Sequence, residues 1–265
     1  MPPAPTTAPM TSPIPSEPRT PSLYHAAPRG AVAVSLALAA IGTILFLQIV
    51  LASAGAPVEV GLGVSFAAAI GVLVLATRRM PDAPGVLGVR RTPWRFIAAG
   101  VLVGGSSWYV RLRLVELLVI PDHTQGLRAA AVDTNLVAAL VTVALLPAIA
   151  EELIFRGVIA RSLARRSQLL AIGVSATLFA IYHVVPIQIV AVFPFGLALA
   201  FIAVRADSIV PTIVAHAINN VIGIAIARGD MPGLARVIDR SPPLALAGSS
   251  LLVVVGLALA WKVAA

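Results

Sequence analysis

The stretch LVAALVTVALLPAIAEELIFR, residues 136–156, decides what kind of protein this is. Its first part, residues 136–150, carries no charge, and Glu151, Glu152 and Arg156 then follow in the same apolar run. A charged side chain at the centre of a membrane helix costs about 2.5–3.5 kcal/mol on insertion scales. Such groups persist where they are paired or where they perform chemistry. The run therefore predicts a membrane helix that contains a polar site.

The spacing of these three charges gives them different tasks. Glu152 and Arg156 stand four residues apart, with the glutamate first, which is the favourable order for an ion pair on a helix. Glu151 points about 100° away, because one helical step turns by that angle. It has no partner on its own helix and a like charge beside it, which suits a general base. A structural ion pair with one additional carboxylate is the alternative, and this stretch alone leaves both open.

The composition places the whole chain in a membrane. Hydrophobic residues make up 59% of the 265 and charged residues only 11%, with a mean hydropathy of +0.97, whereas a soluble domain carries about 25% charged residues. The apolar runs have the length of helices, so we expect an all-α, polytopic membrane helix bundle rather than a β-barrel. The absence of cysteine excludes disulfides, thiolate metal sites and a cysteine nucleophile. The net charge of +8 lies mostly on arginines in short loops, which indicates orientation and contact with the lipid bilayer and no nucleic-acid partner.

The chain divides into a tail and one membrane-embedded domain. Residues 1–29, rich in Pro, Thr, Ser and Ala, predict a disordered tail, and residues 30–265 predict the domain. Ala52-Ser53-Ala54 resembles a signal-peptidase site, but the apolar run before it is longer than a typical signal core, so we expect a retained first helix. About eight transmembrane helices are predicted, at residues 31–52, 60–76, 96–110, 133 to beyond 156, 169–185, 187–204, 209–227 and 244–263.

Charge asymmetry supports an even number of spans. With both termini on one side, the inner segments hold twelve Lys and Arg residues and the outer segments six. Cytoplasmic loops carry this kind of excess. We therefore expect an integral membrane protein with cytoplasmic N and C termini. The arginine-rich, lysine-poor composition is typical of a GC-rich bacterial genome, so the expected location is a bacterial inner membrane.

The two histidines inside predicted spans, His183 and His216, fall near the depth of Glu151. In an antiparallel hairpin that turns near residues 166–168, Glu151 and His183 each stand about 15 residues, or ~22 Å, from the turn. His216 lies on a third helix whose register is less constrained. A single buried histidine is usually a helix–helix hydrogen-bonding group, but three ionisable groups in one layer predict a shared cavity.

Two further spacings add an amide and an aromatic ring to this layer. His216 and Asn220 are four residues apart and share one helix face, as do Phe179 and His183. Phe179 would form a wall under the histidine, although ordinary core packing explains it equally well. Asn219 faces elsewhere and predicts a helix–helix hydrogen bond.

These groups suit the hydrolysis of a bond by water. A carboxylate and an imidazole can orient and deprotonate water, and a second imidazole with an amide N–H can stabilise an oxyanion. Glu151, His183 and His216 could instead bind Zn²⁺ with one open position for water. The sequence contains neither an H-E-x-x-H motif nor a serine or threonine placed as an obvious nucleophile.

Three motifs follow one another along the chain, each on its own apolar helix: Glu151-Glu152-x-x-x-Arg156, Phe179-x-x-x-His183 and His216-x-x-x-Asn220. In this order they resemble the CAAX protease and bacteriocin-processing (CPBP) family of intramembrane proteases, which includes the type II CAAX prenyl endopeptidases. Each motif is weak alone, and the three together are specific. The resemblance covers about residues 90–227.

The resemblance implies a membrane endopeptidase whose site lies within the bilayer and whose substrate is a peptide or a membrane protein. By implication Glu151 and His183 activate water, His216 and Asn220 form the oxyanion pocket, and the supporting residues are Glu152, Arg156 and Phe179. It favours a glutamate-type enzyme without a cofactor, with zinc on Glu151, His183 and His216 as the alternative. The prenylated C-terminal substrate of the eukaryotic members is not transferred to this chain.

Two other functions compete with proteolysis. A non-catalytic membrane scaffold or bacteriocin-immunity protein would keep the same residues as a polar packing core. An ion-coupled carrier is disfavoured, because the sequence shows no inverted repeat and no pair of broken helices.

Overall fold

The computed structural model describes residues 26–118 and 125–261, and every regular element in these ranges is a helix. α9 (Gln168–Tyr182) is apolar but shorter than a full span, and α4 (Trp94–Leu118) is long enough but carries four charged residues. The predicted all-α membrane bundle of about eight spans is confirmed. Six described helices are long and apolar enough to cross a membrane: α1 (Gly30–Ser53), α2 (Val58–Thr77), a continuous rod over Leu136–Ala164, α10 (Pro186–Ala206), α11 (Val210–Arg228) and α13 (Pro242–Trp261).

Three predicted boundaries were wrong. α4 continues eight residues beyond the expected end at Val110, and the ion pair between Arg113 and Glu116, one helical turn apart, supports that extension. The segment between the spans predicted at 209–227 and 244–263 contains α12 (Pro232–Arg240), which begins at a proline whose missing N–H costs nothing in a first turn. α9 ends at Tyr182, so His183 lies just after the helix and not within it.

The remaining short helices fill the connections. α3 (Ala83–Val86) lies between α2 and α4, and α5 (Gln125–Val132) precedes the rod. Most of the predicted disordered tail, residues 1–25, lies outside the described residues. At its end, Ala27 is buried in a small apolar cluster with residues of the rod, α9 and α10.

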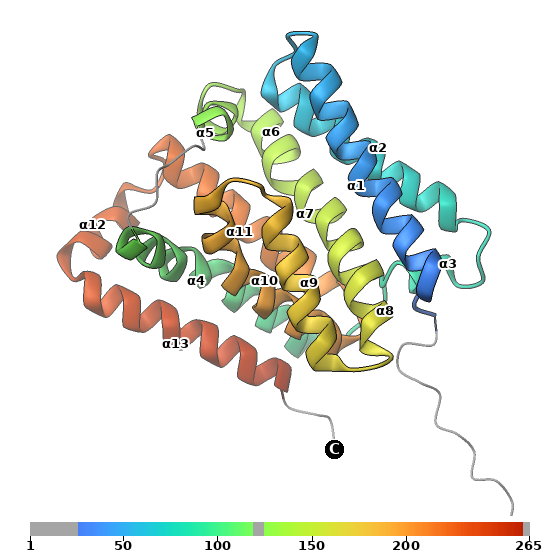
Figure 1. The fold of residues 1–265 in the computed structure, drawn as a ribbon. Helices are drawn as coiled ribbons and strands as arrows, with labels where there is room; N and C mark the ends of the chain where they lie inside the picture. Colours follow the sequence, from blue (N-terminus) through green and yellow to red (C-terminus); the bar gives the residue numbers. More distant parts are fainter. Residues whose placement is uncertain (1–25, 119–124, 262–265) are drawn as a thin grey trace, which may run out of the picture.

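The helices alternate so that the two ends of the described chain emerge on one side of the bundle (Figure 1). The connection from α2 to α4, the turn from the rod to α9 and the turn from α10 to α11 lie on that side as well. The first of these connections carries Arg78, Arg79, Arg90 and Arg91, and the second carries Arg165 and Arg166. Several arginines counted for topology, among them Arg111 and Arg161, instead lie within helices, so the count of twelve against six is not a count of loop residues alone. The cytoplasmic assignment of this face stays a prediction.

Two glycines bring α4 against α11. A Cβ atom on Gly100 would stand 2.3 Å from the backbone oxygen of Pro211, and one on Gly104 would stand 2.2 Å from that of Ala215. No side chain fits at either position, so the two backbones can approach only because both residues are glycine. The contact at Ala215, the residue before His216, fixes the position of α11 along α4.

A buried ionic clasp holds the other end of α11. The guanidinium of Arg161, in α8 (Arg161–Ala164) at the end of the rod, donates from Nε to Asp207 Oδ1 at 2.8 Å and from Nη1 to the Gly85 carbonyl at 2.7 Å. Arg90 approaches the same carboxylate at 3.7 Å. The backbone N–H of Ile209 donates to the Gly88 carbonyl at 2.9 Å. The turn that starts α11 is thus fixed to the rod and to the loop after α3.

Candidate active site

The two adjacent glutamates stand where the rod changes its hydrogen-bonding pattern. The rod consists of α6 (Leu136–Ala139), the π-helix η1 (Leu140–Leu145), α7 (Leu146–Glu151), the π-helix η2 (Glu152–Ala160) and α8. Pro147, which lacks an N–H, stands at the start of α7 where the first π segment ends. Glu151 is the last residue of α7 and Glu152 the first of η2. Segments of π-helix are rare and occur often at functional sites, because they redirect side chains without ending the helix.

Glu152 and Arg156 form the predicted ion pair, and both side chains are completely buried. Arg156 Nη1 donates to Glu152 Oε1 at 2.8 Å, and Nη2 donates to the carbonyl of Gly196 in α10 at 3.1 Å. The guanidinium also lies 4.2 Å above the centre of the Phe179 ring. The arginine therefore ties the rod to α9 and α10 and holds the Glu152 carboxylate in one position.

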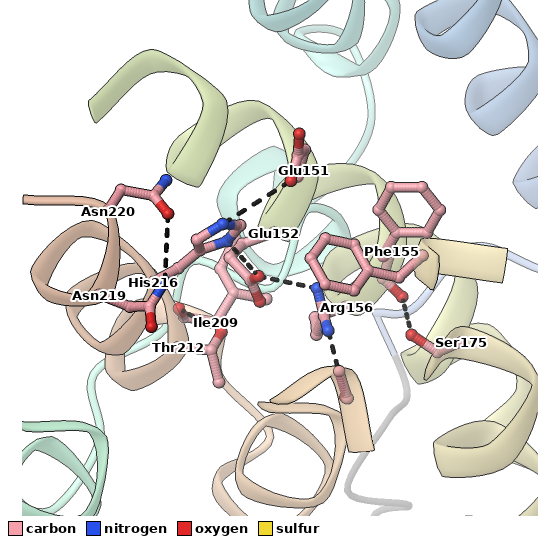
Figure 2. Close-up of polar contacts among 12 residues, drawn as sticks. Glu151, Glu152, Phe155, Arg156, Ser175, Ile209, Thr212, His216, Asn219 and Asn220 are labelled. Carbon is pink, nitrogen blue, oxygen red and sulfur yellow. Dashed lines mark hydrogen bonds and ion pairs between the residues drawn. The ribbon is translucent and has the colours of Figure 1, made fainter. Parts of the chain in front are cut away.

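His216 lies between the two glutamates, with one ring nitrogen directed at each (Figure 2). Its Nδ1 donates to Glu152 Oε1 at 3.0 Å, and its Nε2 is 3.7 Å from Glu151 Oε2. The rings of Phe179 and Phe195 meet the imidazole edge-on, each with its centroid 5.7 Å away. The ring is therefore held by a carboxylate and two aromatic walls, and one nitrogen faces the second carboxylate.

His183 is oriented by its own backbone. Its Nδ1 lies 2.8 Å from the Phe179 carbonyl oxygen, and its ring meets the Phe179 ring at 4.9 Å between centroids. Because a carbonyl oxygen only accepts, Nδ1 carries the proton, and Nε2 of the neutral ring is left as an acceptor. Phe179 touches both imidazoles and Arg156, so it joins the two histidines on one aromatic support. Within the described chain, no hydrogen bond or ion pair joins His183 directly to Glu151.

A hydrogen-bonded chain from α4 reaches the predicted amide. Arg111 Nη2 donates to Asn219 Oδ1 at 2.7 Å, and Asn219 Nδ2 donates to Asn220 Oδ1 at 3.4 Å (Figure 2 shows the second bond). Asn220 Nδ2 lies 3.4 Å from the carbonyl of Ala144 in η1. The chain fixes which end of the Asn220 amide is the donor end. The interhelical bond expected of Asn219 is present, and it comes from Arg111.

Sequence analysis missed Arg111 because charges at positions 111, 113 and 116 interrupt the apolar run. The spacing between Arg111 and Gly104 would have indicated which helix face Arg111 lies on. Arg111 follows Gly104 by seven residues, or two turns, so it extends the glycine face that contacts α11. Its guanidinium also lies 4.8 Å above the Phe195 ring, which in turn touches His216.

The alternative zinc site can be compared with this geometry. No group of three His, Asp or Glu side chains in the described ranges is arranged to hold a metal ion. His216 instead directs one nitrogen at each glutamate, and His183 uses Nδ1 on a backbone carbonyl. Both histidines bond to the protein through Nδ1, which leaves both Nε2 atoms available, so the choice between a metal-free site and a zinc site stays a prediction.

The helix bundle and its buried polar cluster define an integral membrane protein with a candidate active site inside the membrane domain. Residues 133–222 match the family model described as Rce1-like, type II CAAX prenyl endopeptidase Rce1-like. The match confirms the resemblance inferred from the motifs, and it contains all seven motif residues. Comparison with curated proteins and with solved structures gave no match. The family match supports a membrane protease acting on a peptide or protein substrate, and Arg111 lies outside the matched segment.

Proposed function

We propose that this protein is an intramembrane endopeptidase that hydrolyses a peptide bond of a membrane-associated protein or peptide. The observation that carries the proposal is the environment of Glu151. Its side chain is 5% exposed and makes no hydrogen bond to any described residue, yet it lies 3.7 Å from the imidazole of His216. A buried carboxylate without a structural partner, beside an oriented imidazole, is expensive in a membrane. Such a group is a candidate for chemistry rather than for packing.

Each polar group then has a role that follows from its contacts. Glu151, with Nε2 of His183 as an additional acceptor, orients a water molecule and removes its proton as the water attacks the substrate carbonyl. His216 and the Asn220 amide donate to the oxyanion that develops. Glu152 fixes the tautomer and angle of His216, and Arg156 fixes Glu152. The proton on Glu151 passes to the leaving amine when the C–N bond breaks.

Charge balance connects the base and the oxyanion donor. Glu152 and Arg156 neutralise each other, so Glu151 and His216 together need one proton for the cluster to be neutral. With that proton on His216, Glu151 is an ionised base and His216 is a double donor, one N–H to Glu152 and the other toward the substrate oxygen. Both catalytic groups are thus in their active form in the same protonation state. This hydrolysis requires no metal ion, and we propose that the enzyme works without a cofactor.

The decisive experiment compares Glu151→Gln with Glu116→Gln in purified protein reconstituted into lipid nanodiscs with a fluorogenic membrane-anchored peptide. Loss of the base should lower kcat by about 10²–10⁴-fold. Glu116 is exposed on α4, so the same chemical change there should leave turnover unchanged. The measurements are repeated in excess chelator, which should leave wild-type turnover unaffected. Near-wild-type turnover by Glu151→Gln would refute Glu151 as the base, and no turnover by the wild-type protein would support the scaffold hypothesis. Loss of turnover in chelator would support the zinc alternative.

A further inference from the structure

A groove lies between α1 on one side and, on the other, α9 and the C-terminal end of the rod. It has a volume of about 810 Å³ and is lined mainly by apolar side chains of α1, the rod and α9. Its inner end reaches Phe155 and Tyr182, and its other end carries three arginines, Arg29, Arg165 and Arg166. Among the described residues that line it, none is acidic.

The length of the groove matches one leaflet of a bilayer. Along α1 its lining runs from Gly30 to Ile41, which corresponds to ~16 Å at 1.5 Å per residue. The hydrocarbon core of a bilayer is about 30 Å thick, so one leaflet measures about 15 Å. An acyl chain that enters at the arginines would therefore reach the bundle's midplane at Phe155 and Tyr182.

The arginines at the groove's mouth repel one another and attract an anion. Arg29 precedes α1, whereas Arg165 and Arg166 follow the rod, so segments distant in sequence bring like charges together. Partial desolvation and then the positive charge of Arg29 lower the pKa of Arg165. A phosphodiester would be complementary in charge to these side chains, since guanidinium groups bind phosphate oxygens in a forked geometry.

We propose that this groove is a binding site for an anionic phospholipid, with its phosphate among Arg29, Arg165 and Arg166 and one acyl chain between α1 and α9. The apolar walls and the cationic mouth match the two parts of such a molecule. This lipid site does not depend on the proposed hydrolysis. Phe155 nevertheless connects the two sites, because its ring packs against Phe179, beneath the two histidines, with 5.4 Å between the ring centroids.

Native mass spectrometry of the full chain, with phosphatidylglycerol and phosphatidylcholine as probes, tests the headgroup. The wild-type protein should retain phosphatidylglycerol in preference to phosphatidylcholine. The double variant Arg165→Gln/Arg166→Gln should bind phosphatidylglycerol about 30-fold more weakly, which corresponds to about 1 kcal/mol for each guanidinium at a membrane surface. Arg78→Gln/Arg79→Gln is the matched control, because it removes the same charge from exposed positions on the same face. An equal loss in both double variants would refute a specific site.

A second pair of variants tests the acyl chain. Val34 and Val32 are both exposed on α1, but only Val34 lines the groove. Val34→Trp should fill the groove and lower phosphatidylglycerol binding, whereas Val32→Trp should leave it unchanged. Retention of the lipid by Val34→Trp, or displacement of it by millimolar glycerol phosphate alone, would show an anion site without a chain site and overturn the proposal. Unchanged melting temperatures of the variants in detergent establish that each one is folded.

Discussion

Arg156 and Arg161 make two buried ion pairs five residues apart on the same rod, and their surroundings differ in one respect. Both side chains are 0% exposed, and each donates to a carboxylate at 2.8 Å. Each also leaves one buried nitrogen without a hydrogen-bond partner among the described residues. Around Arg161 the other contacts are backbone carbonyls and a second arginine. Around Arg156 they include an imidazole and, beside it, a second carboxylate.

The difference shows that a buried ion pair does not by itself mark an active site. The two clusters are alike in the burial of their arginines and in the distance from arginine to carboxylate. Each also contains buried nitrogens without a hydrogen-bond partner among the described residues. The Arg161 cluster fixes a turn, because its carboxylate is paired with arginines and its other contacts are backbone carbonyls. The Arg156 cluster contains an additional proton acceptor, Glu151, that packing does not require. A candidate active site is therefore distinguished from a structural ion pair by acid and base groups beyond those that the ion pair needs.

The largest expected effect comes from making the same change in both pairs. Arg156→Met should destabilise the protein by about 3–5 kcal/mol, because it removes the cation that neutralises the completely buried Glu152 and leaves that carboxylate to the imidazole of His216. Arg161→Met should cost only about 1–3 kcal/mol, because Asp207 keeps Arg90 and its side chain is 14% exposed. Methionine keeps most of the arginine stem, so the comparison isolates the charge. Chemical denaturation in mixed micelles measures both values.

Activity separates the two pairs further. Per folded molecule, Arg161→Met should retain most of its turnover, whereas Arg156→Met should lose it because Glu152 and His216 are no longer held. Adding Glu152→Gln to Arg156→Met removes the buried charge, so the double variant should regain stability but not turnover. Equal losses of stability in the two single variants would contradict the argument, as would recovery of turnover in the double variant.

A smaller effect is expected where α4 supports the site through α11. Gly104→Ala places a methyl group 2.2 Å from the Ala215 carbonyl, so α11 must move, at a cost of about 1–3 kcal/mol. A shift of this kind next to His216 should lower turnover by about 100-fold. Gly105→Ala adds the same methyl group into open space, and it should be neutral or stabilise the helix by up to about 1 kcal/mol. Denaturation curves and turnover are measured for both variants. If Gly104→Ala and Gly105→Ala have similar stability and turnover, the close contact between α4 and α11 is not needed.

The sequence predicted the parts of this molecule that depend on local pattern. Apolar runs gave the membrane helices to within a few residues, except for the end of α4, and the four-residue spacings placed Glu152 with Arg156 and His216 with Asn220 on shared faces. Such features follow from helical periodicity alone, which is a property of neighbouring residues.

The parts that were missed depend on contacts between distant segments. Nothing near Arg161 indicates that it pairs with Asp207, 46 residues away. Arg111 was left just outside the span predicted for residues 96–110, because charged residues follow there. The π-helical turns around Glu152 have no clear sequence pattern. His183 was placed inside a helix, although Val184 adopts a left-handed backbone with φ of 51° and Pro186 begins the next helix. A residue whose partner lies on another helix shows its role only when the fold is known.

The smallest expected effect tests whether Arg111 belongs to the site or to the packing around it. Arg111→Gln removes the bond that orients Asn219, so the Asn220 amide loses its fixed orientation. Removal of an oxyanion donor typically costs 10²–10³-fold in kcat, and loosening one should cost less, about tenfold. Because the amide acts on the transition state, kcat should fall while KM stays constant. Arg113→Gln is the matched control, because Arg113 lies two residues away and pairs with Glu116 on its own helix.

A purely structural role for Arg111 predicts a different pattern. Arg111 also stacks on Phe195, which touches His216, so a packing defect would lower the melting temperature and affect KM and kcat together. Asn219→Ala separates the two roles, because it breaks the hydrogen-bonded chain and leaves the stacked guanidinium in place. If Asn219→Ala reproduces the tenfold loss of kcat without a change in melting temperature, Arg111 acts through the amide as a positioning residue. If only Arg111→Gln is impaired, its contribution is packing, and the Arg156 cluster needs no support from α4.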